Sequence, residues 1–355
     1  MPHSIHQILF IGEIAGRSQQ RIQTLHNLGI QTQIVANIPH QKTADYASYF
    51  SLLQRISYKL RFPLDSTKLN HRVKAAIHAQ SFDLIFVEKS LVLKPKTLRW
   101  IKQKSRAPIC WYSEDDMAAK HNQTYYFRKS IPYYDVMFTT KSFNCNPEEL
   151  PRLGAKKVVL VEKSFDETSH HPMKLTETEK QQWGADVNFI GTFELQRANC
   201  MLHLAEQGIQ VRIWGNGWQA WQNKHLNLRI ENRAIYDVDY VKALCASKIN
   251  LCFLRKKNRD LQTDRTMEIP ACGAFMIAER TTEHLRLFTE NKEAVYFDVD
   301  HPTELLEKVR YYLKNDTERQ QIADAGRQRC LQSGYTHRHR LEFMLETVKT
   351  LSCVE

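Results

Sequence analysis

The fold is decided by a short stretch in the second half of the chain, Val187-Asn188-Phe189-Ile190-Gly191-Thr192-Phe193-Glu194. Four residues of strand character reach a glycine, a helical pattern then runs over Gln196–Gln207, and Gly208 supplies a stop. Another apolar run, Val211–Trp214, follows shortly after. Strand, helix and strand in this order predict a βαβ unit with parallel strands.

The same alternation continues to the end of the chain. Further strands are expected at Ile249–Leu254, Ala274–Ala278 and Ala294–Phe297, with helices at Val238–Cys245, from near Thr266 and at Pro302–Lys314. The last stretches, Asp316 to about Cys330 and His337–Leu351, are helical in pattern, and no strand follows them.

The first half of the chain has the same organisation. Helical patterns include Arg17–Leu28, which ends at Gly29, and Pro95–Lys104, which opens with a proline. The β-type runs between the helical patterns are Ile8–Ile11, Thr32–Ala36, Leu84–Glu88, Ile109–Ser113, Val136–Thr139 and Val158–Val161. Two such halves predict an α/β protein with two tandem Rossmann-like, doubly wound domains facing a cleft.

The domain boundaries are expected where this periodicity fades. Between Lys163 and Gly184 the apolar spacing gives way to Ser, His, Thr, Glu and Gln. We expect an N-terminal domain over residues 1–165, a linker over 166–186 and a C-terminal domain over 187–330. Residues 331–355 are expected to form a C-terminal helix that packs back toward the N-terminal domain.

Length and composition narrow the class of protein. The 355 residues exceed what one hydrophobic core usually serves, and 42% hydrophobic with 25% charged residues is ordinary for a globular protein. The apolar runs are too short to cross a bilayer, and the N-terminus lacks the basic region of a signal peptide. We expect a cytoplasmic protein, with peripheral association at the inner face of the membrane as an open alternative.

The chain carries a net charge of +11, which favours an anionic partner. Part of this excess lies in residues 42–78, where seven basic residues and two acidic ones alternate with aromatic and aliphatic side chains. One interpretation is a solvated helix face over a packed one, and the other is a patch that binds an anionic membrane surface or an acceptor. Because the basic residues alternate through a helical segment, nucleic acid is not expected as a partner.

Two loops carry residue types suited to a phosphate ligand. Gly191 allows close backbone approach at the start of a helix, where amides favour an anion, and Arg197 adds a cation. The segment from Arg255 to Glu268 lies between a strand and a helix and is dense in charge. Within it Thr263, Arg265 and Thr266 offer hydroxyls, amides and a forked cation, while the Glu268 carboxylate matches a diol. The alternative for this segment is a solvated loop.

These residues carry a resemblance to a known family. The run Arg265-Thr266-Met267-Glu268-Ile269-Pro270-Ala271-Cys272-Gly273, continued as far as Ile322-Ala323-Asp324-Ala325-Gly326, resembles the C-terminal domain of GT-B glycosyltransferases, closest to the CgeB-like spore-maturation branch. The resemblance extends back over Trp214-Gly215-Asn216-Gly217-Trp218, and more loosely over Trp111-Tyr112-Ser113-Glu114-Asp115-Asp116-Met117. It covers nearly the whole chain.

The resemblance implies a nucleotide-sugar donor, UDP-sugar or GDP-sugar, bound by the C-terminal domain, with no cofactor and no metal. The diphosphate would be held by Gly191, Arg197, Thr263, Arg265 and Thr266, and the turn from Gly215 to Trp218 would lie near the base. In related retaining enzymes two carboxylates eight positions apart bracket the donor. Glu268 matches the one that binds the ribose, and Asp260, with Asp264 as a rival, matches the one that touches the sugar.

The acceptor side is less constrained. Asp115 is a candidate catalytic carboxylate near the acceptor, where it would serve as a base if the reaction inverts the anomeric centre, while the alternative is that Asp115 and Asp116 cap the following helix. The expected reaction transfers a sugar to a hydroxyl of a glycan, lipid-linked or protein acceptor bound mainly by the N-terminal domain, with retention favoured by the carboxylate spacing. A nucleotide-sugar epimerase of GT-B fold and a non-catalytic sugar-binding or nucleotide-binding protein remain as alternatives.

Overall fold

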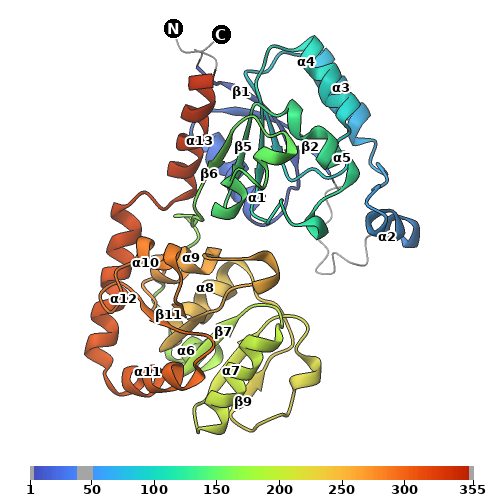
Figure 1. Ribbon diagram of the computed structural model, residues 1–355. Coiled ribbons are helices and arrows are strands. Elements are labelled where there is room, and N and C mark those ends of the chain that lie inside the picture. The colour runs from blue at the N-terminus through green and yellow to red at the C-terminus, as the bar shows by residue number, and fades with distance from the viewer. Residues whose placement is uncertain (1–3, 38–50, 352–355) are drawn as a thin grey trace. The chain divides into compact units, whose positions relative to one another are not determined.

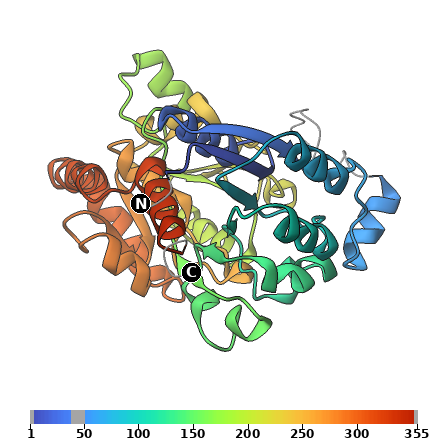
Figure 2. The ribbon, with the colours of Figure 1, turned by 90° about the horizontal axis from the view of Figure 1, so that it is seen from above.

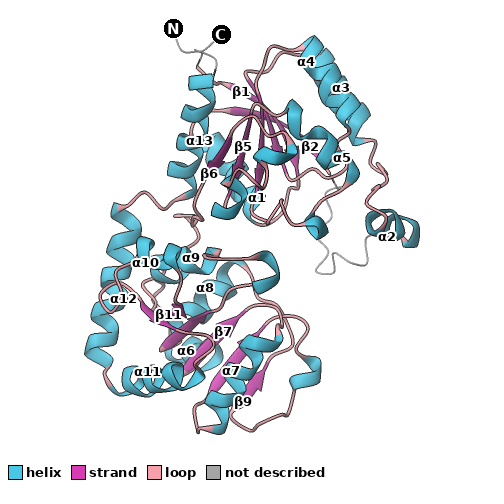
Figure 3. Cartoon of the chain, viewed as in Figure 1, coloured by secondary structure: helices cyan, strands magenta, loops and turns pink. Residues whose placement is uncertain are grey.

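The computed structural model describes residues 4–37 and 51–351. The chain divides into two compact units, and it passes from one to the other twice. Unit 1 comprises Met1–Glu162 and His337–Glu355, and unit 2 comprises Lys163–Thr336. Residues 166–186, expected as a linker, therefore fall within unit 2, and the last helix belongs to unit 1. Each unit is built on a six-stranded parallel sheet flanked by helices on both faces (Figures 1 and 3).

The sheet of unit 1 has the order β2-β1-β3-β4-β5-β6. Its strands are β1 (Gln7–Gly12), β2 (Gln31–Ala36), β3 (Leu84–Glu88), β4 (Ile109–Ser113), β5 (Val136–Thr139) and β6 (Val158–Leu160). The helices are α1 (Arg17–Asn27), α2 (Leu52–Lys59), α3 (Leu69–Ala79), α4 (Pro95–Lys104), α5 (Tyr125–Ser130) and α13 (His337–Leu351).

Successive residues of β1 point to opposite faces of this sheet, as a strand requires. Leu9 belongs to the apolar cluster that contains residues of α3 and α4, whereas Phe10 belongs to the cluster that contains residues of α1 and α13. Both faces are therefore covered, which explains the continuous apolar character of the strands.

The sheet of unit 2 has the order β12-β11-β10-β7-β8-β9. Its strands are β7 (Val187–Ile190), β8 (Val211–Trp214), β9 (Leu228–Ile230), β10 (Ile249–Cys252), β11 (Met276–Glu279) and β12 (Val295–Phe297). The helices are α6 (Glu177–Trp183), α7 (Leu195–Glu206), α8 (Asp237–Ala246), α9 (Asp264–Ala271), α10 (Thr282–Leu287), α11 (Pro302–Lys314) and α12 (Asp316–Gln332).

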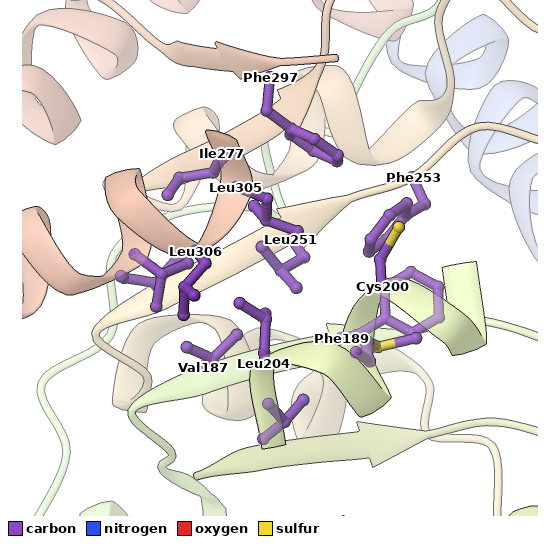
Figure 4. Packing of buried hydrophobic residues seen from close by; sticks show 14 of the residues in the cluster. Val187, Phe189, Cys200, Leu204, Leu251, Phe253, Ile277, Phe297, Leu305 and Leu306 are labelled. Carbon is purple, nitrogen blue, oxygen red and sulfur yellow. The ribbon is translucent and has the colours of Figure 1, made fainter. Parts of the chain in front are cut away.

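One face of this second sheet packs on α7 and α11 through a large apolar core (Figure 4). In it Phe189 of β7 and Leu251 of β10 lie among side chains from both helices, such as Leu204 and Leu305. The other face packs on α8 and α9. This double cover confirms the expected doubly wound α/β class.

The structure describes only part of the basic segment 42–78. Residues 42–50 lie outside the described residues, and the rest forms α2, α3 and the turn between them. No helix in the described ranges combines the length and apolar character needed to cross a bilayer.

Candidate active site

The strand order of unit 2 defines where a ligand is expected. The order in which strands are added to the sheet reverses between β7 and β10, which are parallel neighbours although β8 and β9 come between them in sequence. In doubly wound sheets ligands bind beyond the carboxyl ends of the strands at such a switch point. Gly191 follows β7 there, and Phe253 and Leu254 follow β10.

Arg265, in the first turn of α9, lies at this point. Its Nη2 donates to the carbonyl oxygen of Phe253 at 3.3 Å, and its guanidinium carbon is 5.7 Å from the centre of the Phe189 ring. Its Nε is buried and has no hydrogen-bond partner within the described part of the chain. Arg265 is half-buried, so it combines a fixed position with some access to solvent.

Arg197, in the first turn of α7, approaches the same ring from the other loop. Its guanidinium carbon is 5.5 Å from the ring centre of Phe189. Its Nη2 donates to the carbonyl oxygen of Leu254 at 3.1 Å and pairs with Glu194 at 3.0 Å. Burial lowers the pKa of Arg197, Glu194 opposes this change, and the nearby Arg265 adds to it. Only 2% of the Arg197 side chain is exposed, so it contributes positive charge from the interior and is not available for direct contact with a ligand.

Two glycines allow the loops after β7 and β8 to touch. A Cβ atom added to Gly215 would lie 2.0 Å from the carbonyl oxygen of Gly191, and one added to Gly191 would lie 2.8 Å from the Phe189 ring and 3.4 Å from Nη1 of Arg265. Trp218 donates from its Nε1 to the same Gly191 oxygen at 2.9 Å. The Trp218 side chain is fully buried, so in this structure it supports the two turns and offers no ring face to a ligand.

The hydroxyl of Thr266 belongs to the interior. Thr266 Oγ1 accepts from the backbone N–H of Thr263 at 3.0 Å and lies 2.9 Å from Nε2 of His284. Nδ1 of His284 lies 2.6 Å from the Glu279 carbonyl oxygen, which can only accept, so Nδ1 carries the proton and Thr266 donates to Nε2. Burial lowers the pKa of His284 to about 4. These bonds fix the first turn of α9 against α10, and the Thr266 hydroxyl is therefore not presented to solvent.

Glu268 lies one turn further along α9 in a small buried cluster. Its Oε2 accepts from the Tyr240 hydroxyl at 2.6 Å, and its Oε1 is 3.8 Å from Nε2 of His170. Burial and the Glu268 carboxylate raise the pKa of Tyr240. Sequence reasoning missed Tyr240 and His170 because no local spacing connects them with Glu268.

Both rivals for the sugar-contacting carboxylate have partners within unit 2. Asp260 accepts from Nδ2 of Asn258 at 2.7 Å and pairs with Nε of Arg255 at 3.1 Å. Asp264 pairs with Lys163 at 3.2 Å. Lys163 thus pairs with the acidic side chain in the first turn of α9.

A further buried carboxylate, Glu279, braces the loop after β10. Its Oε1 accepts from the backbone N–H of Leu254 at 2.7 Å, and its Oε2 pairs with Lys256 at 2.7 Å. Because the carbonyl oxygen of Leu254 holds Arg197, Glu279 positions the loop that carries this contact. The sequence offered no signal for it beyond a single acid at the end of a strand.

Asp115 lies in unit 1, beyond the carboxyl end of β4, and is not among the residues gathered at the switch point of unit 2. Its carboxylate pairs with Lys89, and one fifth of its side chain is exposed. Asp116, in contrast, is buried and accepts from the N–H of Ala119 at 3.3 Å and from Nδ2 of Asn144 at 2.7 Å. Asp116 therefore stabilises a turn and does not cap the following 3-10 helix (Lys120–Asn122), whose N-cap residue is Ala119 without a side-chain cap. Asp115 keeps a partly accessible ion pair.

The sheet of unit 1 has its own switch point, between β1 and β3. Arg21 of α1 is buried there, with its guanidinium paired to Glu88 and, at 2.9 Å, to Glu114. Tyr112 lies under the same cation, 4.9 Å from ring centre to guanidinium carbon. This cluster was not anticipated from the sequence, since its members come from three separate elements.

Comparison with known proteins gives one family match and a set of similar folds. Residues 197–346 match the model of a protein family described as glycosyl transferase-like. The match includes Arg197, Asp260, Arg265 and Glu268. The chain therefore carries a glycosyl transferase-like domain that spans most of the candidate site. No curated protein sequence matches the chain.

Solved structures show the same two-domain fold. Sucrose-phosphate synthase from Thermosynechococcus elongatus is similar with a TM-score of 0.69 and 13% identity, over 99% of this chain and all of that one. Alr3699/HepE from Anabaena, solved with UDP and glucose, gives 0.64 and 11%, over 97% of this chain and 100% of that one. A UDP-forming α,α-trehalose-phosphate synthase from Burkholderia xenovorans gives 0.63 and 10%, over 98% and 100%. The chain has the GT-B fold of glycosyltransferases.

Proposed function

We propose that this protein is a glycosyltransferase that moves a sugar from a nucleotide-sugar donor to a hydroxyl acceptor. The observation that carries the proposal is the pair of arginines held over Phe189 at the switch point of unit 2, inside a glycosyl transferase-like domain. Two cations set beside a helix start and a glycine turn suit a diphosphate. We also propose that the protein belongs to the CgeB-like branch, on the basis of its sequence motifs alone.

The chemistry required of such a site is stabilisation of the leaving nucleoside diphosphate. Negative charge grows on the diphosphate as the bond to the anomeric carbon breaks, and fixed cations at that point lower the barrier. Arg265 is the proposed direct contact because it is half-buried and anchored by one carbonyl. Arg197 would add positive potential from its buried position, and the first-turn amides of α9 would add theirs. We propose that no metal and no cofactor is needed.

The donor would be read by groups further along α9. Glu268 is proposed to accept hydrogen bonds from the ribose, with Tyr240 orienting its carboxylate. The turn from Gly215 to Trp218 would line the base. Asp260 or Asp264 would contact the sugar after release from its present partner. UDP is the favoured nucleotide, because the structurally similar Anabaena protein was solved with UDP.

The acceptor would be bound by unit 1. Asp115 is the proposed carboxylate near the acceptor hydroxyl, and in this structure it pairs with Lys89. Retention of the anomeric configuration is proposed from the spacing of Asp260 and Glu268. A glycan, lipid-linked or protein hydroxyl would serve as acceptor, and peripheral attachment to a membrane would suit a lipid-linked one.

The proposal is tested by a thermal-shift panel of nucleoside diphosphates and their sugars. Stabilisation by one nucleotide series, with no requirement for a divalent cation, is the expected result. Turnover of the stabilising nucleotide sugar then distinguishes the alternatives. A glycosyltransferase releases nucleoside diphosphate faster when an acceptor is added, an epimerase converts the donor without one, and a non-catalytic binder does neither. No stabilisation by any nucleotide would contradict the proposal.

A further inference from the structure

Large apolar side chains are exposed in unusual number on one part of unit 1. Leu52, Leu53 and Leu60 are 72%, 70% and 66% exposed. Together with four exposed neighbours they form what we term the α2 surface: Leu52, Leu53, Ile56, Tyr58, Leu60, Phe62 and Leu64. Single exposed apolar residues are ordinary, but seven within thirteen consecutive positions indicate a binding surface.

The α2 surface has a defined local structure. Ser51 and Gln54 form a capping box at the start of α2, so the helix begins at a fixed residue. At its end the backbone N–H of Phe62 donates to the Ser57 carbonyl at 2.9 Å, and that of Leu64 donates to the Ser57 hydroxyl at 3.2 Å. The turn therefore folds back on the helix, and the exposed side chains are held by a bonded backbone.

A second contact joins this turn to the rest of unit 1. The ring of Phe62 stacks on that of Tyr125, with 4.8 Å between centres, and the Tyr125 N–H donates to the Arg61 carbonyl at 2.8 Å. Both views place α2 at the outer edge of unit 1, away from its sheet (Figures 1 and 2). The α2 surface is thus fixed to the domain, and the described residues of unit 1 leave it uncovered.

The charge of this segment is of one sign. Between Ser51 and Leu64 the chain has three basic residues, Arg55, Lys59 and Arg61, and no acidic residue. All three basic residues are exposed. Leucine, isoleucine and aromatic side chains interleaved with exposed cations are typical of segments that lie in the interface of an anionic membrane.

We propose that the α2 surface docks on an anionic phospholipid bilayer, with its apolar side chains at the boundary of headgroups and acyl chains and its three cations among the lipid phosphates. A second copy of the chain fits less well, because a two-fold contact through this surface would bring the cations of both copies together. The inference does not depend on the proposed function, since lipid binding requires neither donor nor acceptor.

The test is co-sedimentation of the full chain with phosphatidylcholine vesicles and with vesicles that contain phosphatidylglycerol. Wild type is expected to bind the anionic vesicles at least tenfold more tightly, and added salt should weaken this binding. The triple variant Leu52→Ser, Leu53→Ser, Leu60→Ser should lose at least tenfold in affinity. Leu226→Ser, at a leucine of unit 2 that is 88% exposed, is the control and should bind like wild type.

A second pair of variants isolates the charge. Arg55→Gln, Lys59→Gln, Arg61→Gln should lose at least tenfold, whereas neutralising the exposed cations Arg152, Lys180 and Arg229 should change little. If the leucine variant unfolds, as judged by circular dichroism, the charge variants decide. Equal binding of wild type to both vesicle types, or equal loss in variants and controls, overturns the proposal. Self-association of wild type that the leucine variant abolishes, without vesicle binding, overturns it in favour of a dimer surface.

Discussion

Arg197 and Arg265 hold their guanidinium groups over the same aromatic ring, 5.5 and 5.7 Å from the centre of Phe189. Their charges repel, and the arrangement is held by carbonyl oxygens of the loop after β10, which bind both cations, and by the Glu194 carboxylate, which pairs with Arg197. A bound diphosphate would relieve this repulsion. Under the proposed function, the pair would form a site that is preorganised for an anion.

Replacing Arg265 tests the proposed phosphate contact. Arg265→Ala should lower turnover by about 10²–10³-fold, as loss of a transition-state donor does. It should also weaken nucleoside diphosphate binding by roughly tenfold or more, because hydrogen bonds to charged groups contribute about 1.5–3 kcal/mol. Isothermal titration and initial rates measure both effects. Arg229→Ala, which removes an exposed cation on β9, is the control, and equal behaviour of the two variants would remove Arg265 from the site.

Glu268 is predicted to recognise the ribose and not the phosphates. Glu268→Gln should weaken binding of a nucleoside diphosphate by roughly tenfold, while binding of inorganic pyrophosphate stays unchanged. Arg265→Ala should weaken both ligands. Competition titrations with the two ligands separate these patterns. A Glu268→Gln variant that loses pyrophosphate and nucleotide equally would show that the residue acts through the fold of α9.

Glu279 is predicted to be a positioning residue. Glu279→Ala leaves the buried Leu254 N–H without its acceptor, which should cost about 1–3 kcal/mol of unfolding free energy and raise the donor KM. Glu279→Gln keeps an acceptor for that N–H and should recover much of both losses. Denaturant unfolding and donor KM are measured together. Identical values for the two variants would contradict this role.

His284 makes stability depend on pH. Its pKa is lowered from 6.5 to about 4 by burial, so between these pH values the unfolded chain binds a proton that the folded chain does not. Stability is therefore lost as the pH falls from about 6.5 toward 4, by roughly 3 kcal/mol at most. Thermal unfolding across this range should show a shallower pH slope for His284→Gln than for wild type. Replacing the exposed His121 in the same way should leave the slope unchanged, and an unchanged slope for His284→Gln would refute the prediction.

Transfer is predicted to proceed without a divalent cation. In the proposed site the positive charges of Arg265 and Arg197, together with the start of α9, would stabilise the leaving diphosphate in place of a metal ion. Turnover should therefore be the same, within about twofold, before and after dialysis against EDTA. Loss of turnover that magnesium or manganese restores would contradict it. If dialysis against EDTA abolishes turnover and no metal restores it, the dialysis has damaged the protein. Thermal shifts of the protein before and after dialysis then show this damage.

The strands were predictable where both faces are buried. The expected bounds of β3, β4, β5, β7 and β8 agree with the structure, because these apolar runs are too short for an ordinary helix and fit a strand that is buried on both faces. Strand β9 was missed because it has three residues and an exposed centre at the edge of the sheet. Helix α6 was missed although Thr176 and Glu179 carry the spacing of a capping box.

The residue types of the candidate site could be predicted from the sequence. The solvent exposure of their side chains could be predicted less well. The position of Arg265 and Gly191 at one sheet edge follows from parallel topology, since the carboxyl ends of β7 and β10 meet there. That Trp218 and Thr266 point into the interior could not be foreseen, because their partners, Gly191 and His284, come from other loops. Tyr240 reaches Glu268 across 28 positions of sequence, which no local pattern encodes.

The central claim is tested most directly by a crystal structure of the chain grown with UDP. The account predicts electron density for the diphosphate beyond the carboxyl ends of β7 and β10, with a phosphate oxygen within hydrogen-bond distance of the Arg265 guanidinium and the ribose beside Glu268. Density for the nucleotide at another place on the molecule, with Arg265 still bound only to the Phe253 carbonyl, would contradict it.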